Sequence, residues 1–342
     1  MRWRSFVIKA LISVGLVMYL VHRTGGWETL AAWVRIVPPT VLLWAWVLYF
    51  TAVVLGSVKW AILLRAQGLP VPWMALVRYT LIGAFFNNLL PANVGGDVMR
   101  GYELAHHTQR RTDAAISVIM DRLVGLLTFL TTAAVAGTAL LVLDRWGGVP
   151  LTQDARENVS RLTGVAWSAE VGLLLLMGLM LSRRLKRRGE HVLQRIPWFR
   201  KGAPLFHQVA VALNAYRHAY LALLMGSAVS GGILLLTGVE TWLLVQALVP
   251  ERVPFLYVML VNPLIAFALL VPLSIGGLGI GQTAYIFFFG LLGVSSPVAL
   301  ALSLLHQGIV YTASLPGAVL WLRSRERSTP VGERGMMAPP AR

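Results

Sequence analysis

The residues best suited to bind a ligand lie between positions 87 and 103, where the chain reads Asn-Asn-Leu-Leu-Pro-Ala-Asn-Val-Gly-Gly-Asp-Val-Met-Arg-Gly-Tyr-Glu. A glycine pair at the start of a helix lets the backbone turn and presents free amides, which suit a phosphate. The arginine that follows adds a planar, two-pronged donor for phosphate oxygens. The aspartate between them could fix that arginine or bind a substrate ammonium. The string predicts a binding site composed of Asn87, Asn88, Pro91, Asn93, Gly95, Gly96, Asp97 and Arg100.

The same string also has a purely structural interpretation. Asp97 could be the N-cap of a helix over residues 98–107, with the two glycines forming a turn and Arg100 facing the lipid headgroups. We favour the functional interpretation, because an acid and a base beside a broken membrane helix are costly unless they are useful.

Asp121 and Arg122 form a second charged group, inside an apolar segment. Adjacent residues do not share a helix face. We therefore expect one of them to face Asp97 or Arg100 and the other to face the inner membrane interface. Arg122 could instead extend along its helix until its charge reaches the membrane surface.

Glu240 lies deep in another apolar segment. By default an acid at membrane depth is a functional hypothesis, although a buried pair with a purely structural role is the alternative. Its expected partner is one of three basic residues, Lys59, Arg78 or Arg100.

A second glycine-rich string, Pro-Leu-Ser-Ile-Gly-Gly-Leu-Gly-Ile-Gly-Gln, spans residues 272–282 and carries no charge. It shares the pattern of proline, three residues and two glycines with Pro91–Gly96. Interrupted apolar segments at matching places in two halves of a chain point to a transporter binding site, so Gly276, Gly277 and Gln282 join the predicted site. His306 could reach this string or could be a packing histidine.

The composition excludes a soluble enzyme. Hydrophobic residues make up 57% of the 342 positions and charged residues only 13%, whereas a soluble domain has about 25% charged residues. The chain has no cysteine, which excludes disulfides, thiolate nucleophiles and cysteine-based metal sites. Its net charge of +16 indicates contact with anionic lipid headgroups rather than nucleic acid. We expect no metal and no cofactor.

The apolar segments predict an all-α polytopic membrane protein with six transmembrane helices. Two further segments, 73–97 and 255–293, are broken by proline and glycine and are expected to form re-entrant hairpins. The two halves, 1–160 and 161–322, would then form an inverted repeat within a single domain. The six expected spans are Phe6–Val21, Val41–Leu64, Ala114–Leu143, Gly164–Leu181, Tyr220–Val249 and Val298–Leu322.

The positions of Lys and Arg predict the orientation. They cluster near the N-terminus, at 183–201 and in the tail 323–342, which we expect to be disordered. Because basic loops stay on the cytoplasmic side, both termini should be cytoplasmic, with loops 144–162 and 250–254 outside. The first hairpin would then enter from the cytoplasm and the second from outside. The basic block 183–217 would lie along the inner surface, where it fixes topology or recruits a specific lipid.

Taken together, the Asn-Asn-Leu-Leu-Pro string with its Gly-Gly-Asp, the later Asp121-Arg122 pair and the Gly-Gly-Leu-Gly at 276–279 resemble the lysylphosphatidylglycerol synthase transmembrane-region family. The resemblance extends from about residue 10 to residue 322. It implies a membrane domain that flips an aminoacylated phospholipid. In the best-understood members this domain is fused to a soluble aminoacyl-transferase domain; we expect a stand-alone member here, without lipid synthesis. Many relatives have Glu where this chain has Gln282, so a substrate cation would rely on Asp97, Asp121 or Glu240.

We therefore expect a lipid flippase of the bacterial inner membrane rather than an enzyme. Its substrate would be a phospholipid with an anionic or aminoacylated headgroup, and a second copy of the chain or a lipid-synthesis enzyme is a candidate partner. Three alternatives stay open: a secondary transporter of a soluble substrate, a membrane-embedded lipid-modifying transferase, and a scaffold that transports nothing.

Overall fold

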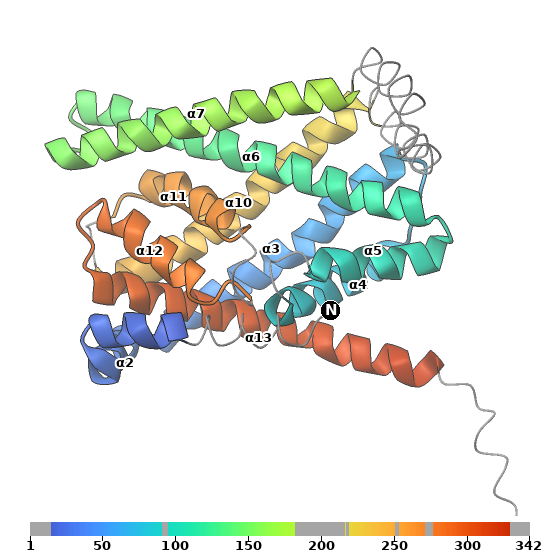
Figure 1. Ribbon diagram of the computed structural model, residues 1–342, viewed down its shortest axis with the longest axis horizontal. Coiled ribbons are helices and arrows are strands. Elements are labelled where there is room, and N and C mark those ends of the chain that lie inside the picture. Colours follow the sequence, from blue (N-terminus) through green and yellow to red (C-terminus); the bar gives the residue numbers. More distant parts are fainter. Residues whose placement is uncertain are drawn as a thin grey trace, which may run out of the picture.

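In the computed structural model, the described residues are 15–90, 95–181, 216, 219–249, 253–270 and 276–328, and this part of the chain is helical with no strand. Figure 1 shows most of the helices lying along one long axis, with α6 and α7 on one side and α13 on the other. The helices are α2 (Gly26–Ile36), α3 (Pro39–Ala66), α4 (Trp73–Leu89), α5 (Gly95–Thr108), α6 (Arg111–Arg145), α7 (Gln153–Leu181), α10 (Tyr220–Leu248), α11 (Phe255–Ala268), α12 (Ile280–Gly290) and α13 (Ser296–Ser328).

Four helices in the described part are long and apolar enough to cross a membrane: α3, α6, α10 and the Ser296–Ser324 part of α13. Only 17% of the most apolar window of α3 and 22% of that of α10 is buried within the protein. Most of each window is therefore not fully buried within the protein, as expected of helices that contact lipid tails.

These four helices coincide with four of the six predicted spans. The predicted span Gly164–Leu181 forms the second part of α7. Of the predicted span Phe6–Val21, only residues 15–21 are described, and they are helical. The last helix continues to Ser328, past the expected end of its span at Leu322. The predicted surface element at 183–217 lies outside the described residues apart from Tyr216, as does the tail beyond 328.

Prolines mark where several helices begin. Pro39 is the first residue of α3, and Pro72 and Pro254 directly precede α4 and α11. Proline suits these places because its fixed φ fits the first helical turn, where its missing N–H would have no intrahelical partner. After the C-terminal end of α6, Gly147 turns the chain with a φ of +76°, a conformation that favours glycine.

The two predicted interruptions are present. Helix α4 ends at Leu89 and α5 begins at Gly95, while α11 ends at Ala268 and α12 begins at Ile280. These helices have 17, 14, 14 and 11 residues, each short of the roughly 20 needed to cross the hydrocarbon core. In Figure 1 the α4–α5 pair and the α11–α12 pair lie toward opposite ends of the long axis.

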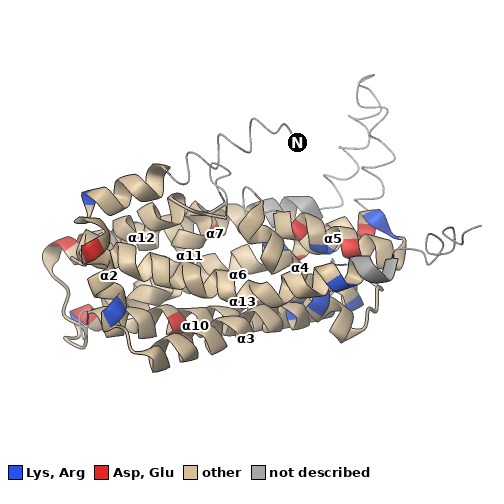
Figure 2. Cartoon of the chain, turned by 90° about the horizontal axis from the view of Figure 1, so that it is seen from below, with Lys and Arg blue, Asp and Glu red and all other residues tan. Residues whose placement is uncertain are grey.

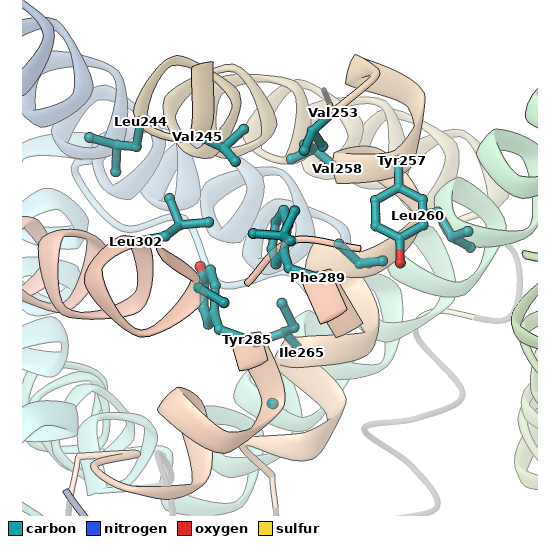
Figure 3. Packing of buried hydrophobic residues seen from close by; sticks show 14 of the residues in the cluster. Leu244, Val245, Val253, Tyr257, Val258, Leu260, Ile265, Tyr285, Phe289 and Leu302 are labelled. Atoms are coloured by element: carbon teal, nitrogen blue, oxygen red, sulfur yellow. The ribbon is translucent and has the colours of Figure 1, made fainter. Parts of the chain in front are cut away.

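A buried apolar cluster fixes the second broken pair in place (Figure 3). The rings of Tyr285 and Phe289 on α12 stack at 5.7 Å, and the Tyr257 hydroxyl on α11 donates to the Phe288 carbonyl over 2.5 Å. Leu244 of α10 contributes to the same cluster. The ends of α10, α11 and α12 therefore pack as one body against α13.

Charged side chains are unevenly distributed along the helices. Figure 2 shows most acidic and basic residues gathered toward two opposite ends, with long tan stretches of uncharged residues between them. One of these groups lies around α4 and α5.

Candidate functional site

A cavity of about 420 Å³ lies among α3, α4, α5, α6, α10, α11, α12 and α13. Residues from both broken pairs line it, so two segments far apart in the sequence share one polar space. The polar residues of its wall are Lys59, Thr80, Asn87, Asn88, Asp97, Arg100, Asp121, Arg122, Ser230, Gln282, Ser303, His306, Gln307 and Ser314.

Five of these residues form one continuous series of ion pairs, which we call the charged chain: Lys59, Asp121, Arg100, Asp97 and Arg122. Lys59 Nζ lies 3.0 Å from Asp121 Oδ1, and Arg100 Nη2 lies 2.7 Å from Asp121 Oδ2 and 2.9 Å from Asp97 Oδ1. Arg122 Nε completes the series at Asp97 Oδ2. Within the described residues, this series brings three cations, Lys59, Arg100 and Arg122, together with two anions.

The middle of the charged chain is well protected from solvent. Arg100 is 9% exposed and Asp121 is 4% exposed. The Arg100 guanidinium lies 5.1 Å from the centre of the Trp60 ring, and Trp60 is itself held by a 3.2 Å hydrogen bond to Ser117. The Nε of Arg100 is buried without a hydrogen-bond partner. Packing therefore fixes this guanidinium while leaving one donor unused.

The prediction that either Asp121 or Arg122 faces Asp97 or Arg100 is confirmed by Asp121, and the second residue, Arg122, also joins the charged chain by pairing with Asp97. Asp121 faces α3 and α5 directly, where it contacts Lys59 and Arg100. Arg122 starts from another face of α6, but its long side chain reaches Asp97 on α5. The rule about adjacent residues applies to Cβ directions and not to the ends of long side chains.

The first glycine motif, Gly95-Gly96, marks a close crossing of two helices. A Cβ on Gly96 would lie 2.0 Å from the Gly83 carbonyl oxygen on α4. The Gly96 N–H donates to Asn87 Oδ1 over 2.8 Å, so the prediction of a free amide at this position is wrong. Asp97 lies inside α5, which begins at Gly95, so the alternative interpretation as the N-cap is also wrong.

The second glycine motif, Gly276-Gly277, contacts Asn88 of α4, the residue that follows Asn87. Gly276 has a φ of +56°, and a Cβ there would lie 2.6 Å from the Asn88 carbonyl oxygen. Asn88 Nδ2 also donates to Ser314 Oγ on α13 over 2.8 Å. Asn87 and Asn88 therefore lie between the two glycine motifs.

The other predicted residues of the two strings have different outcomes. Gln282 lines the cavity, but its Oε1 accepts the Gly279 N–H over 2.5 Å, so it caps the start of α12. Gly277 adopts a φ of +76°, which fits its place in the turn. Pro91 and Asn93 lie outside the described residues.

Glu240 has a different partner from those predicted. His306 Nδ1 lies 3.1 Å from each of its carboxylate oxygens, whereas Lys59 and Arg100 belong to the charged chain. The His306 ring also lies 5.8 Å from the ring of Tyr285 on α12. His306 thus reaches the second broken pair, as one of the two interpretations anticipated, and in addition binds Glu240.

Sequence reasoning missed Lys59 and His306 as members of the site. Each is an ionisable residue in an apolar helix that was predicted to cross the membrane. Such residues rarely face lipid and usually pair with one another, so their positions alone indicated that each has an acidic partner inside the protein.

Comparison with known proteins agrees with the membrane architecture. The family model described as the lysylphosphatidylglycerol synthase TM region matches residues 6–317. A UPF0104 membrane protein of Methanothermobacter thermautotrophicus is 24% identical over 295 residues, which cover 80% of this chain and 82% of that protein. No solved structure matches.

Proposed function

The chain belongs to the lysylphosphatidylglycerol synthase transmembrane-region family, and on that premise we propose that it is a lipid flippase of the bacterial inner membrane. It would move a phospholipid with an anionic or aminoacylated headgroup between the leaflets without changing it chemically. The charged chain at a cavity among apolar helices, with the buried Arg100 at its centre, is the observation that carries the proposal.

A phosphodiester headgroup carries one negative charge, which the buried Arg100 guanidinium would attract. Arg100 still has an unpartnered Nε, and guanidinium groups bind phosphate oxygens through planar pairs of donors. An aminoacylated headgroup adds an ammonium, for which Asp97 and Asp121 are suitable acceptors. A cavity of about 420 Å³ can hold a headgroup while the acyl chains stay in the bilayer.

The placement of the broken helices supports transport by alternating access. The α4–α5 and α11–α12 pairs lie toward opposite ends of the molecule (Figure 1), as expected for re-entrant hairpins of an inverted repeat that enter from opposite sides. Broken helices that meet at a polar site are characteristic of secondary transporters. We propose that the two halves rock around the cavity and expose the headgroup to each leaflet in turn.

The proposed topology places position 160 outside and position 328 in the cytoplasm. Because the chain has no native cysteine, single cysteines introduced at Ser160 and Ser328 can be labelled without background. In intact cells a membrane-impermeant maleimide should label the first and spare the second. Labelling of both positions from the same side would contradict this orientation.

The flippase proposal predicts that phospholipid movement depends on the arginines of the charged chain. In vesicles that contain fluorescent phospholipids, the wild type should move labelled lipid from the inner to the outer leaflet, where dithionite quenches its fluorescence. Arg100→Gln and Arg122→Gln should each slow this movement at least about tenfold, the expected cost of losing one charge-assisted hydrogen bond.

The matched control is Arg110→Gln, which removes a guanidinium that is 52% exposed and pairs with Asp113 over 2.7 Å. It should move lipid at the wild-type rate. Equal lipid movement by all variants, or none by the wild type, would count against the proposed site. Uptake of a water-soluble solute without lipid movement would favour the secondary transporter, and a chemically altered lipid would favour the transferase.

A further inference from the structure

Glu240 and His306 form a second polar group, which the proposed headgroup site does not use. Glu240 on α10 is fully buried, and His306 Nδ1 on α13 lies 3.1 Å from both of its oxygens. The Thr241 hydroxyl donates to Glu240 Oε2 over 3.1 Å, and Asn262 of α11 donates to that hydroxyl over 2.9 Å. Within the described residues no Lys or Arg forms a salt bridge with Glu240, so His306 is its basic partner.

Aromatic side chains enclose the imidazole. The Tyr49 ring of α3 meets it edge-on at 5.8 Å, and the Tyr285 ring of α12 lies tilted at 5.8 Å. These two tyrosines are the titratable groups that face the pair from α3 and α12, while α10 and α11 contribute the uncharged Thr241 and Asn262. The acids and bases of the charged chain line the same cavity.

The cavity gives protons access to the pair through His306. The His306 side chain is 22% exposed and lines the cavity, whereas Glu240 is 0% exposed and lies behind it. In the neutral imidazole, Nδ1–H donates to the carboxylate and Nε2 is the nitrogen that accepts a proton. A proton from cavity water therefore reaches the buried carboxylate by way of His306.

We propose that the Glu240–His306 pair binds and releases one proton in each transport cycle, so that the proton gradient drives lipid movement. This inference rests on the proposed flippase function and adds its coupling ion. Proton addition at Nε2 gives an imidazolium beside a carboxylate, with no net charge. Proton release leaves neutral imidazole beside a buried negative carboxylate, which is costly without a cation. Deprotonation therefore favours a different arrangement of α10 and α13.

Such a rearrangement would reach the lipid site through α13 and α12. Helix α13 carries both His306 and Ser314, and Ser314 accepts the hydrogen bond of Asn88. Helix α12 carries Tyr285 and follows directly from the Gly276 turn, which contacts the Asn88 carbonyl. A shift of either helix thus acts on α4 next to the charged chain.

The test measures lipid movement with and without a pH gradient in sealed vesicles. Transfer of a short-chain fluorescent phospholipid is followed by albumin extraction, which avoids a pH-sensitive quencher. A gradient between about pH 6 and pH 8, which brackets imidazole titration, should raise the wild-type rate at least about fivefold, the lower range of typical coupling. The lipid transfer rates of Glu240→Gln and His306→Asn should not respond to the gradient.

His22→Asn is the matched control, since it removes an exposed imidazole outside the cavity, and it should respond like the wild type. A wild-type rate that ignores the gradient, or variants that still respond to it, would overturn the coupling and leave the flippase function standing. Absence of any lipid movement by the wild type would contradict both the proton coupling and the flippase function. If neither variant folds, pyranine trapped in wild-type vesicles decides: proton entry that accompanies lipid transport supports the inference, and lipid transport without proton entry overturns it.

Discussion

Replacing Gly96 with alanine is expected to prevent the protein from folding stably. The new Cβ would lie 2.0 Å from the Gly83 carbonyl oxygen and 2.7 Å from Asn87 Cγ, and the first of these atoms belongs to the backbone of a packed helix. Helices α4 and α5 would have to separate, breaking the hydrogen bond between Gly96 and Asn87. We expect a loss of about 3 kcal/mol or more, measured as a lower melting temperature in detergent and a smaller monodisperse fraction.

Gly101→Ala provides the control on the same helix. A Cβ there would lie 3.5 Å from Val118 Cγ2, an ordinary van der Waals contact, and alanine favours the helix by up to about 1 kcal/mol over glycine. The melting temperature should therefore stay level or rise. A Gly96→Ala protein as stable as Gly101→Ala would contradict the close crossing of α4 and α5.

Replacing Asp121 with asparagine is the second substitution with a large expected effect. The change keeps the shape of the side chain but leaves Lys59 and Arg100 without their shared anion in a site where Asp121 is 4% exposed. Breaking a buried ion pair by removing one partner typically costs about 3–5 kcal/mol. Thermal denaturation in detergent should show this loss. Asp113→Asn on the same helix, which breaks a partly exposed pair with Arg110, should cost about 1 kcal/mol or less.

A double variant separates the charge effect from a packing effect. Adding Lys59→Met to Asp121→Asn removes one cation together with the anion, so that the net charge of the site is the same as in the wild type. If uncompensated charge is the cause, the double variant should be more stable than Asp121→Asn alone, with a coupling energy above about 0.5 kcal/mol. Additive losses would instead indicate a defect in packing.

The sequence was sufficient to predict the long apolar helices and the two interruptions, but not α2 or the part of α7 before Gly164, which was expected to be a loop. Helix α3 shows why: an apolar run begins at a proline pair and is long enough to cross a bilayer. The break after Leu89 was predictable for a related reason, since proline and a glycine pair follow within a few residues. Local composition decides both features, and local composition is what a single sequence displays.

Partners across helices were harder to predict. Glu240 and His306 belong to helices that are not adjacent in the chain, so nothing local links them. Gly96 was predicted to offer an amide to phosphate, and the backbone crossing that makes glycine necessary there became visible only with Gly83 in place. Asp121 and Arg122 were expected to face different surroundings because their Cβ atoms point in different directions. The length of the Arg122 side chain decides its contacts instead.

The neighbouring positions of Asn87 and Asn88 have a consequence for the barrier against ion leakage. Two consecutive residues of α4 make these contacts: Asn87 accepts the Gly96 N–H, and the Asn88 carbonyl oxygen lies against the Gly276 turn. In the proposed alternating-access cycle, a rotation of α4 that loosens one of these contacts would tighten the other, so the cavity would not open to both leaflets at the same moment. A headgroup could then cross while the bilayer stays closed to protons and salt, apart from what the transport cycle itself carries.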